Sequence, residues 1–244
     1  MVQERINKYW TQRANEFSGL RISDFKSDLR PKYTKLIKEH LPNLPEVRAL
    51  DLGTGAGFFS FILADLGCKV TAIDYSDAML ENAKQNAKDL GFEGIDYQQM
   101  DAQNLEFEDK SFDFVFSRNV TWTLPDPQKA YKEVCRVLKS NGCFLNLDAN
   151  YGKGFKETDE RGEAPYHPTQ SAEQLRERND IAKSIYICEK LRPQWDADVL
   201  INFGMKYIEI DLEIEKVLCF DSEKDEKERL RISGNPLFKI FARK

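Results

Sequence analysis

Three aspartates and one glycine-rich bend are the groups in this sequence best suited to bind a ligand. Asp51, Asp74 and Asp101 each end a short strand-like segment. The first of these segments leads directly into the bend, which consists of Gly53, Thr54, Gly55, Ala56 and Gly57. Glycine can adopt positive φ and, without a Cβ, lets a ligand approach the main chain. A strand, this bend and a following helix therefore predict a ligand that lies against backbone N–H groups.

The spacing of the glycines separates two classes of ligand. The dinucleotide-binding fingerprint has a third glycine or alanine three positions after the second, and Phe58 stands there in this chain. A carboxylate at Asp51 would repel a pyrophosphate but attract a ligand with an ammonium or sulfonium group. Asp74 is suited to accept hydrogen bonds from both hydroxyl groups of a ribose. The pattern favours an adenosine ligand and weakens the nicotinamide dinucleotide interpretation.

At Asp51 and the three glycines that follow it, the sequence resembles the class I S-adenosylmethionine-dependent methyltransferases, whose first motif is an acid followed by Gly-x-Gly-x-Gly. The resemblance implies S-adenosylmethionine as cofactor and S-adenosylhomocysteine as product. It also implies that Asp101 accepts a hydrogen bond from the adenine amino group and that the N–H of Ala102 meets a ring nitrogen. The residues expected to bind the cofactor are Asp51, Gly53, Thr54, Gly55, Gly57, Asp74, Tyr75, Met79, Asp101, Ala102 and Asn119.

A second resemblance lies in the aromatic pair Tyr9-Trp10 and the following Arg13-Ala14. Many small-molecule methyltransferases begin with a helix that bears such a pair, and in them this helix lies over the cofactor and helps to close the pocket. The alternative is that both aromatic residues only pack on the main domain.

The methyl acceptor is expected to meet a pocket that is rich in aromatic residues. The candidate residues of this pocket are Tyr9, Trp122, Tyr151 and His167, with Asp148 as a further candidate. His167 could act as a general base, although a solvated loop histidine is the alternative interpretation. No catalytic residue is assigned, because a methyl group on a sulfonium is already activated and the protein mainly has to align the acceptor and exclude water.

The segment after the fourth predicted strand excludes some acceptors. Enzymes that methylate adenine amino groups or glutamine amides resemble one another here, since they carry Asn or Asp, two prolines and an aromatic residue. Residues 117–125 lack this tetrad, which argues against those substrates.

Parallel strands would bring the three acids to one edge of a sheet. Periodicity and turn residues predict strands over residues 48–51, 69–74, 95–101, 111–116, 143–147, 208–215 and 236–241. Helices are predicted over most of residues 1–41 and over 58–66, 77–90, 127–138, 171–190 and 192–204. The arrangement resembles the class I methyltransferase sheet. It implies an α/β, Rossmann-like, doubly wound seven-stranded sheet with a final antiparallel strand, N-terminal helices and a helical lid insertion after the fifth strand.

The chain is expected to form a single domain. Its predicted parts are an N-terminal helical cap over residues 1–44, a cofactor-binding half over 45–149, a lid insertion over 150–191, and a C-terminal helix with the closing strands over 192–244. The lid insertion begins in a long loop that is rich in glycine, proline and charge, and loops of that length are often functional. It is the segment expected to select the methyl acceptor.

Composition restricts the partners and the compartment. The 244 residues are 41% hydrophobic and 32% charged with a net charge of -5, which is typical of a soluble globular protein. Lysine and arginine are spread along the chain, so no nucleic-acid partner is expected. Five separate cysteines and only two histidines predict neither a disulfide framework nor a metal site. No signal peptide or membrane-spanning run is found, so a cytoplasmic protein without a membrane partner is expected. Whether it is a monomer or a dimer stays open.

Three functions remain compatible with these residues. The leading one is methyl transfer from S-adenosylmethionine to a small-molecule acceptor by direct displacement. The second is methylation of a protein or a tRNA, which would require a docking surface. The third is an NAD-binding Rossmann enzyme or a non-catalytic nucleotide-binding module.

Calorimetry separates the third function from the first two. We expect S-adenosylhomocysteine to bind and NAD not to bind when each is titrated separately, because Phe58 replaces a fingerprint residue and Asp51 disfavours a pyrophosphate. Binding of NAD alone would contradict the methyltransferase assignment.

Overall fold

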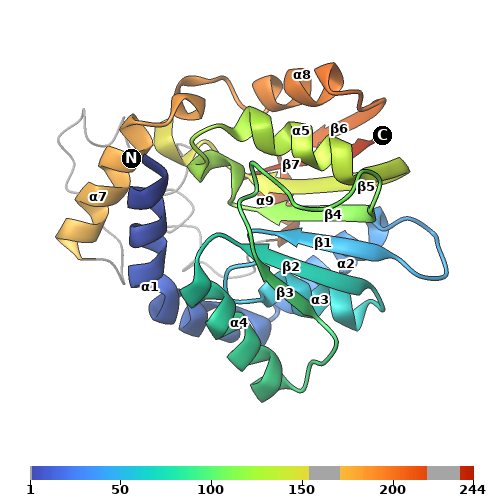
Figure 1. Ribbon diagram of the computed structural model, residues 1–244, viewed down its shortest axis with the longest axis horizontal. Helices are drawn as coiled ribbons and strands as arrows, with labels where there is room; N and C mark the ends of the chain where they lie inside the picture. Colours follow the sequence, from blue (N-terminus) through green and yellow to red (C-terminus); the bar gives the residue numbers. More distant parts are fainter. Residues whose placement is uncertain (1, 154–170, 219–236) are drawn as a thin grey trace.

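The computed structural model describes residues 2–153, 171–218 and 237–244 and contains one sheet in the order β3-β2-β1-β4-β5-β7-β6 (Figure 1). The first five strands pair in parallel, and β7 is antiparallel to both of its neighbours, β5 and β6. The strands are β1 (Arg48–Leu52), β2 (Lys69–Asp74), β3 (Asp96–Gln99), β4 (Phe112–Arg118), β5 (Leu138–Asp148), β6 (Tyr207–Asp211) and β7 (Phe238–Arg243). The predicted fold class is confirmed, including the antiparallel closing strand.

Helices cover both faces of the sheet, as expected for a doubly wound fold (Figure 1). The helices are α1 (Val2–Phe25), α2 (Leu29–His40), α3 (Phe58–Asp65), α4 (Asp77–Leu90), α5 (Pro127–Val137), α7 (Ala172–Lys183), α8 (Gln194–Asn202) and α9 (Ile214–Leu218), with short 3-10 turns η1 (Thr121–Thr123) and η2 (Tyr186–Glu189). One core cluster packs α5 and α8 on the sheet, and a second packs α2 and α3 on the other face. The strand order reverses between β1 and β4, so a ligand crevice is expected beyond their carboxyl ends.

Local sequence signals explain most of these boundaries. Asp126 caps α5 by accepting a hydrogen bond from the N–H of Lys129, and Pro127 follows in the first turn, as predicted. Helix α4 starts after Ser76 and ends at Gly91, whose φ is 78°. Strand β1 is buried on both faces after its first residue, and β4 is buried on both faces up to its last, which is typical of central parallel strands.

Helix α1 lies across the carboxyl ends of the strands, at the left of Figure 1, beside α7. It is fastened to α4 by a hydrogen bond of 2.9 Å from the side-chain amide of Asn86 to the hydroxyl of Ser18. It is fastened to α7 by Arg5, which donates two hydrogen bonds of 3.0 Å to Glu177. The N-terminal segment is therefore a cover over this edge of the sheet.

Three predicted elements differ from the structure, and the first is the fifth strand. It was expected from Cys143 after a helix and a turn at Asn141-Gly142, but β5 begins at Leu138, directly after α5. The turn is a bulge within the strand, with Asn141 at φ 64° and a register shift against Phe112 and Phe114.

The second difference is the helix that starts at Ser171. Ser171 and Gln174 form a capping box at its start, but the helix ends at Lys183 and not at Lys190. The hydroxyl of Ser184 donates to the carbonyl of Ile181. The chain then turns inward and forms η2, so that Ile185 and Ile187 are buried.

The third difference is the alternating segment 208–215, which was expected to be one half-buried strand. Strand β6 ends at Asp211, Leu212 is 58% exposed, and Ile214 is buried in α9. Glu209 accepts a hydrogen bond of 2.7 Å from Lys239 of β7, so the predicted acidic outer face is partly paired. The predicted strand over 236–241 is observed as β7.

Some predictions lie outside the described residues. These are most of the loop between residues 151 and 170, which includes His167, and the charged connection over 221–231. The division of the chain into a cap, a cofactor half and a lid stays a prediction. In the three described ranges, no helix has both the length and the apolar character needed to cross a membrane.

A buried ionic cluster joins the end of β5 to α8. The side chains of Asp148, Arg192 and Asp196 are each 0% exposed. Nη2 of Arg192 lies 2.7 Å from Asp196 and 3.2 Å from Asp148, and it donates a hydrogen bond of 2.7 Å to the hydroxyl of Thr121. The hydroxyl of Tyr131 donates to Asp196. We call Asp148, Arg192, Asp196, Thr121 and Tyr131 the ionic cluster.

We expect Arg192→Met to lower the free energy of unfolding by about 3 to 5 kcal/mol, because it leaves two buried carboxylates without their cation. The matched control is Arg5→Met, which removes the partly exposed pair with Glu177 and should cost about 1 kcal/mol or less. Urea unfolding measures both. The loss of unfolding free energy in Arg192→Met should become smaller toward acidic pH, because the two carboxyl groups can then be buried in their neutral form. Equal losses in the two variants would contradict the role of the cluster.

Candidate active site

The glycine bend is fixed between β2 and the loop that follows β4. The N–H groups of Gly53 and Thr54 both donate to the carbonyl of Ile73, at 2.9 and 2.8 Å. Gly53 has a φ of 72°, and a Cβ there would lie 2.5 Å from a methyl group of Val120. Glycine is required at this position because the loop after β4 packs directly against the main chain of the bend. The loops after β1 and β4 therefore meet at the point where the strand order reverses.

Helix α1 covers the bend from the other side. Gly55 has a φ of 54°, and a Cβ there would lie 3.0 Å from the ring of Phe17. The hydroxyl of Thr11 lies 3.1 Å from that of Ser76, at the start of α4. The N-terminal helix is thus placed over the predicted cofactor residues.

Asp74 connects β2 to the bend. One of its carboxylate oxygens accepts a hydrogen bond of 2.9 Å from the N–H of Gly55, and the other accepts one of 2.9 Å from the N–H of Ser76. Burial raises the pKa of Asp74, although these N–H groups act in the opposite direction. Its neighbour Tyr75 is 38% exposed, and Met79 is buried below it in α4.

Asp101 and Ala102 follow β3, and a glutamine that sequence reasoning missed holds them. The N–H of Gln103 donates to Asp101 at 2.8 Å, and its side-chain amide donates to both carboxylate oxygens at 3.0 and 3.2 Å. The amide oxygen of Gln103 accepts from the N–H of Asp126 at 2.8 Å. Ala102 is 8% exposed. Gln103 therefore links Asp101 to the start of α5. The only sign of this role in the sequence was the position of Gln103 close to Asp101.

Asp51 is buried, whereas all three acids were expected to meet at an open edge of the sheet. It is 1% exposed and accepts a hydrogen bond of 2.6 Å from the hydroxyl of Ser60 in α3. Ser60 in turn lies 2.8 Å from the hydroxyl of Thr54 in the bend. Burial raises the pKa of Asp51 to about 6. Asp51 therefore supports the bend from beneath, and the isolated serine in the apolar run of α3 was the sequence signal for it.

Two of the four predicted acceptor-pocket residues lie together beside Asn119. The hydroxyl of Tyr151 donates a hydrogen bond of 3.2 Å to the side-chain oxygen of Asn119, whose φ is 57°. The rings of Trp122 and Tyr151 are 5.2 Å apart at an angle of 60°. Burial raises the pKa of Tyr151 to about 12, so its hydroxyl keeps its proton at neutral pH.

The other acceptor candidates have different surroundings. Tyr9 is 4% exposed and belongs to a small hydrophobic cluster with Ile181 and Cys188, which is the packing role given above as the alternative. Its hydroxyl accepts from Arg13 at 3.3 Å. Asp148 is paired with Arg192 in the ionic cluster and accepts a hydrogen bond of 3.0 Å from the backbone N–H of Trp122. It therefore positions Trp122, and its buried carboxylate is not exposed to an acceptor. His167 lies outside the described residues.

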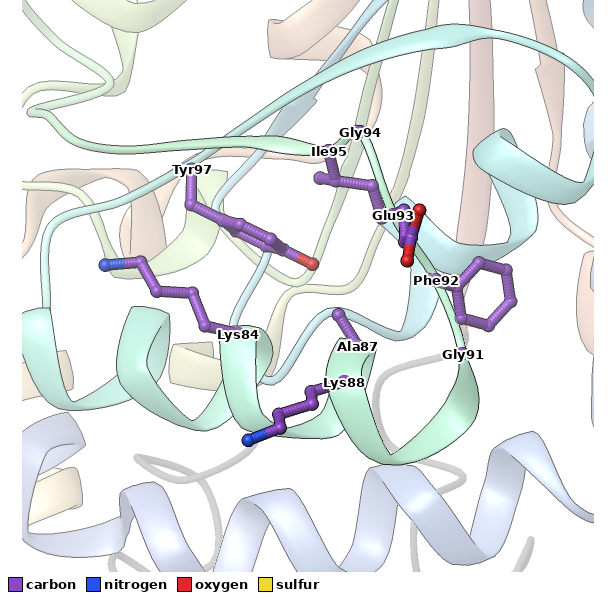
Figure 2. Close-up of a pocket in the computed structure, with 9 residues that line it drawn as sticks. All are labelled: Lys84, Ala87, Lys88, Gly91, Phe92, Glu93, Gly94, Ile95 and Tyr97. Carbon is purple, nitrogen blue, oxygen red and sulfur yellow. The ribbon is translucent and has the colours of Figure 1, made fainter.

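A groove of about 320 Å³ lies elsewhere, between the second half of α4 and β3 (Figure 2). Lys84 and Lys88 come from α4, and the ring of Tyr97 comes from β3. The groove contains none of the residues predicted to bind a cofactor or an acceptor.

The comparisons with known proteins agree on one family. A model described as "Methyltransferase domain" matches residues 44–203. The uncharacterized methyltransferase YcgJ of Bacillus subtilis is 37% identical over 103 residues, which span 42% of this chain and 41% of that protein. The chain therefore matches less than half the length of this curated relative.

Two solved structures share the fold. Phosphoethanolamine N-methyltransferase 2 of Haemonchus contortus in complex with S-adenosyl-L-methionine has a TM-score of 0.61 at 21% identity, covering 86% of this chain and 51% of that one. A putative S-adenosyl-L-methionine-dependent methyltransferase of Methanococcus maripaludis has a TM-score of 0.62 at 21% identity, covering 95% and 92%.

We expect Asp74→Ala to weaken binding of S-adenosylhomocysteine by about 1 to 3 kcal/mol, because it removes the predicted acceptors for the ribose and leaves the N–H groups of Gly55 and Ser76 without their carboxylate partner. The control is Asp96→Ala, at the exposed start of β3, which should leave the affinity unchanged. Asp74→Asn retains one acceptor oxygen, so its affinity for S-adenosylhomocysteine should lie between the affinities of the other two variants. Calorimetry that found no change in Asp74→Ala would place the cofactor elsewhere.

Proposed function

Because this chain belongs to the methyltransferase domain family, we propose that it transfers a methyl group from S-adenosylmethionine to a small-molecule acceptor. The observation that carries the proposal is the bend between β1 and α3. It is built from glycines, it lies under α1, and the N–H of Gly55 donates a hydrogen bond to Asp74, the acid that ends β2.

The residues present fit an adenosine-containing cofactor. Glycine at positions 53 and 55 lets Val120 and Phe17 pack directly against the bend, because a Cβ at either position would intrude on those side chains. The carboxylate of Asp74 accepts from backbone N–H groups of the bend and of the start of α4, and its two oxygens together have enough lone pairs to accept from a ribose hydroxyl as well. Asp101 would accept from the adenine amino group and Ala102 would donate its N–H, while Tyr75, Met79 and Asn119 would complete the walls. Asp51 would act through the bend.

The protein's own part in the reaction is positioning. S-adenosylmethionine supplies an activated methyl group when bound, so general-base catalysis is needed only for an acceptor that holds its proton tightly. Tyr151 keeps its proton at neutral pH and donates it to Asn119, so its hydroxyl oxygen would orient the acceptor by accepting a hydrogen bond. The backbone N–H of Trp122 donates a hydrogen bond to Asp148 of the ionic cluster, so Trp122 would supply a fixed aromatic wall. Helices α1 and α7 would limit the access of water.

The small size of the acceptor rests on two observations. The crevice is covered by α1, which is fastened at both of its sides, to α4 and to α7. The Haemonchus contortus relative is named for a small substrate, phosphoethanolamine. A macromolecular acceptor would have to reach the same crevice past α1.

An extract experiment tests the class of acceptor. A cell extract is separated by size, and each pool is incubated with the protein and with cofactor that carries a labelled methyl group. We expect label in the small-molecule pool, and much less with Asp74→Ala at low cofactor concentration, because that variant binds the cofactor weakly. Label confined to the macromolecular pool would reject the proposal.

A further inference from the structure

A glutamine joins the acid that follows β3 to the helix that covers the site. The side-chain amide nitrogen of Gln103 donates to both carboxylate oxygens of Asp101. The same nitrogen donates a hydrogen bond of 3.2 Å to the side-chain oxygen of Gln3, which lies in the first turn of α1. Asp101, Gln103 and Gln3 therefore form a continuous chain of side chains from the end of β3 to the covering helix.

The orientation of the Gln103 amide is fixed by the main chain. Its oxygen accepts a hydrogen bond of 2.8 Å from the backbone N–H of Asp126, and a backbone N–H can only donate. The amide nitrogen must then face the other way, where its two N–H groups meet two acceptors, Asp101 and Gln3. Every hydrogen-bonding group of this amide has a partner when α1 is docked.

The two oxygens of Asp101 are used unequally. Oδ1 accepts from the backbone N–H of Gln103 at 2.8 Å and from its side-chain amide at 3.0 Å. Within the described ranges, Oδ2 accepts only the longer contact of 3.2 Å from that amide. An ionised carboxylate has about four lone-pair sites, so Oδ2 can accept from a further donor. Asp101 is partly exposed, as contact with a ligand requires.

We propose that Gln103 and Gln3 are positioning residues for the base of the cofactor. This inference rests on the proposed function, in which Asp101 accepts a hydrogen bond from the adenine amino group. Gln103 occupies Oδ1 and leaves Oδ2 for the amino group, and Gln3 supports the amide in this orientation only while α1 is docked. Recognition of the base would therefore depend on the covering helix, although α1 itself need not touch the base.

The test compares two ligands that differ in one group. S-adenosylhomocysteine and its 6-deamino analogue, in which hydrogen replaces the adenine amino group, are titrated by calorimetry into the wild-type protein and into Asp101→Ala, Gln103→Met and Gln3→Met. Methionine keeps the length of glutamine and removes its hydrogen bonds. The measured quantity is the ratio of the two dissociation constants, because a general loosening of the site would weaken both ligands alike.

Two matched controls remove similar contacts elsewhere. Gln98→Met removes a side-chain amide that donates to Asp96 at 2.6 Å, with the same two-residue spacing as the pair in the site. Thr11→Val removes the hydroxyl contact of 3.1 Å that joins α1 to Ser76, so it loosens the covering helix without touching Asp101 or its partners. Thermal unfolding of each unliganded variant checks that it is folded.

We expect the wild type to bind S-adenosylhomocysteine about tenfold more tightly than the analogue, the value of one hydrogen bond to a charged group. Gln103→Met should lose most of this preference, mainly through weaker binding of S-adenosylhomocysteine. Gln3→Met should lose part of it, and the double variant should discriminate no worse than Gln103→Met alone, because the two residues act in one chain. Asp101→Ala should show no preference, and both controls should keep the wild-type ratio.

Each opposite outcome has a separate meaning. Equal weakening of both ligands in Gln103→Met, or no change in either, would overturn the inference. A wild-type protein that binds both ligands equally, or Asp101→Ala with its preference intact, would also overturn it and leave the proposed function standing. An unchanged ratio in Gln3→Met, or an equal loss in Thr11→Val, would overturn the part assigned to Gln3. Failure of the wild type to bind S-adenosylhomocysteine would overturn both the inference and the proposed function.

Discussion

The carbonyl of Ile73 accepts hydrogen bonds from two successive N–H groups of the bend, those of Gly53 and Thr54, and the rest of the site depends on this attachment. It fixes the bend to β2 while its other side packs on Val120, so the loops after β1, β2 and β4 form one unit. Asp74 adds a third attachment through the N–H of Gly55. Backbone groups that are satisfied in this way cannot rearrange without leaving buried donors unpaired. The conformation of the bend is therefore fixed by its neighbours in the protein.

The acceptor side is held by a different kind of interaction. Trp122 and the residues after β5 are positioned by the ionic cluster, in which Asp148 binds both Arg192 and the N–H of Trp122. Buried ion pairs contribute little net stability, because desolvation offsets the attraction, but removing one partner is costly. Such a cluster specifies one geometry more than it strengthens the fold. We infer that side chains can be replaced on the proposed cofactor side wherever the main chain makes the contacts. The proposed acceptor side, in contrast, requires the particular side chains of the ionic cluster.

This difference explains what the sequence could predict. The bend, the aspartates at the carboxyl ends of β2 and β3 and the cap of α5 follow from local patterns, whereas the sheet with its antiparallel closing strand was implied by the family resemblance. The bulge in β5 could not be predicted, because the same residues, Ser140 to Gly142, also form an ordinary turn signal. The burial of Asp51 depends on Ser60, nine residues later in another element. Arg5 and Glu177 are far apart in the sequence, and only the packing of α1 beside α7 brings them together. Contacts of this kind have no local signature in a single sequence.

The carboxylates of the site lie on one side of the point where the strand order reverses. Asp74 ends β2, Asp101 follows β3, and Asp51 lies beneath the bend. The cationic sulfonium of the proposed cofactor would meet the opposite charge on this side. The acceptor would then approach from the side of β4, where Asn119, Trp122 and Tyr151 lie together. Orientation achieved in this way needs no dedicated catalytic base, because aligning an activated methyl group with its acceptor can itself supply a large part of the rate.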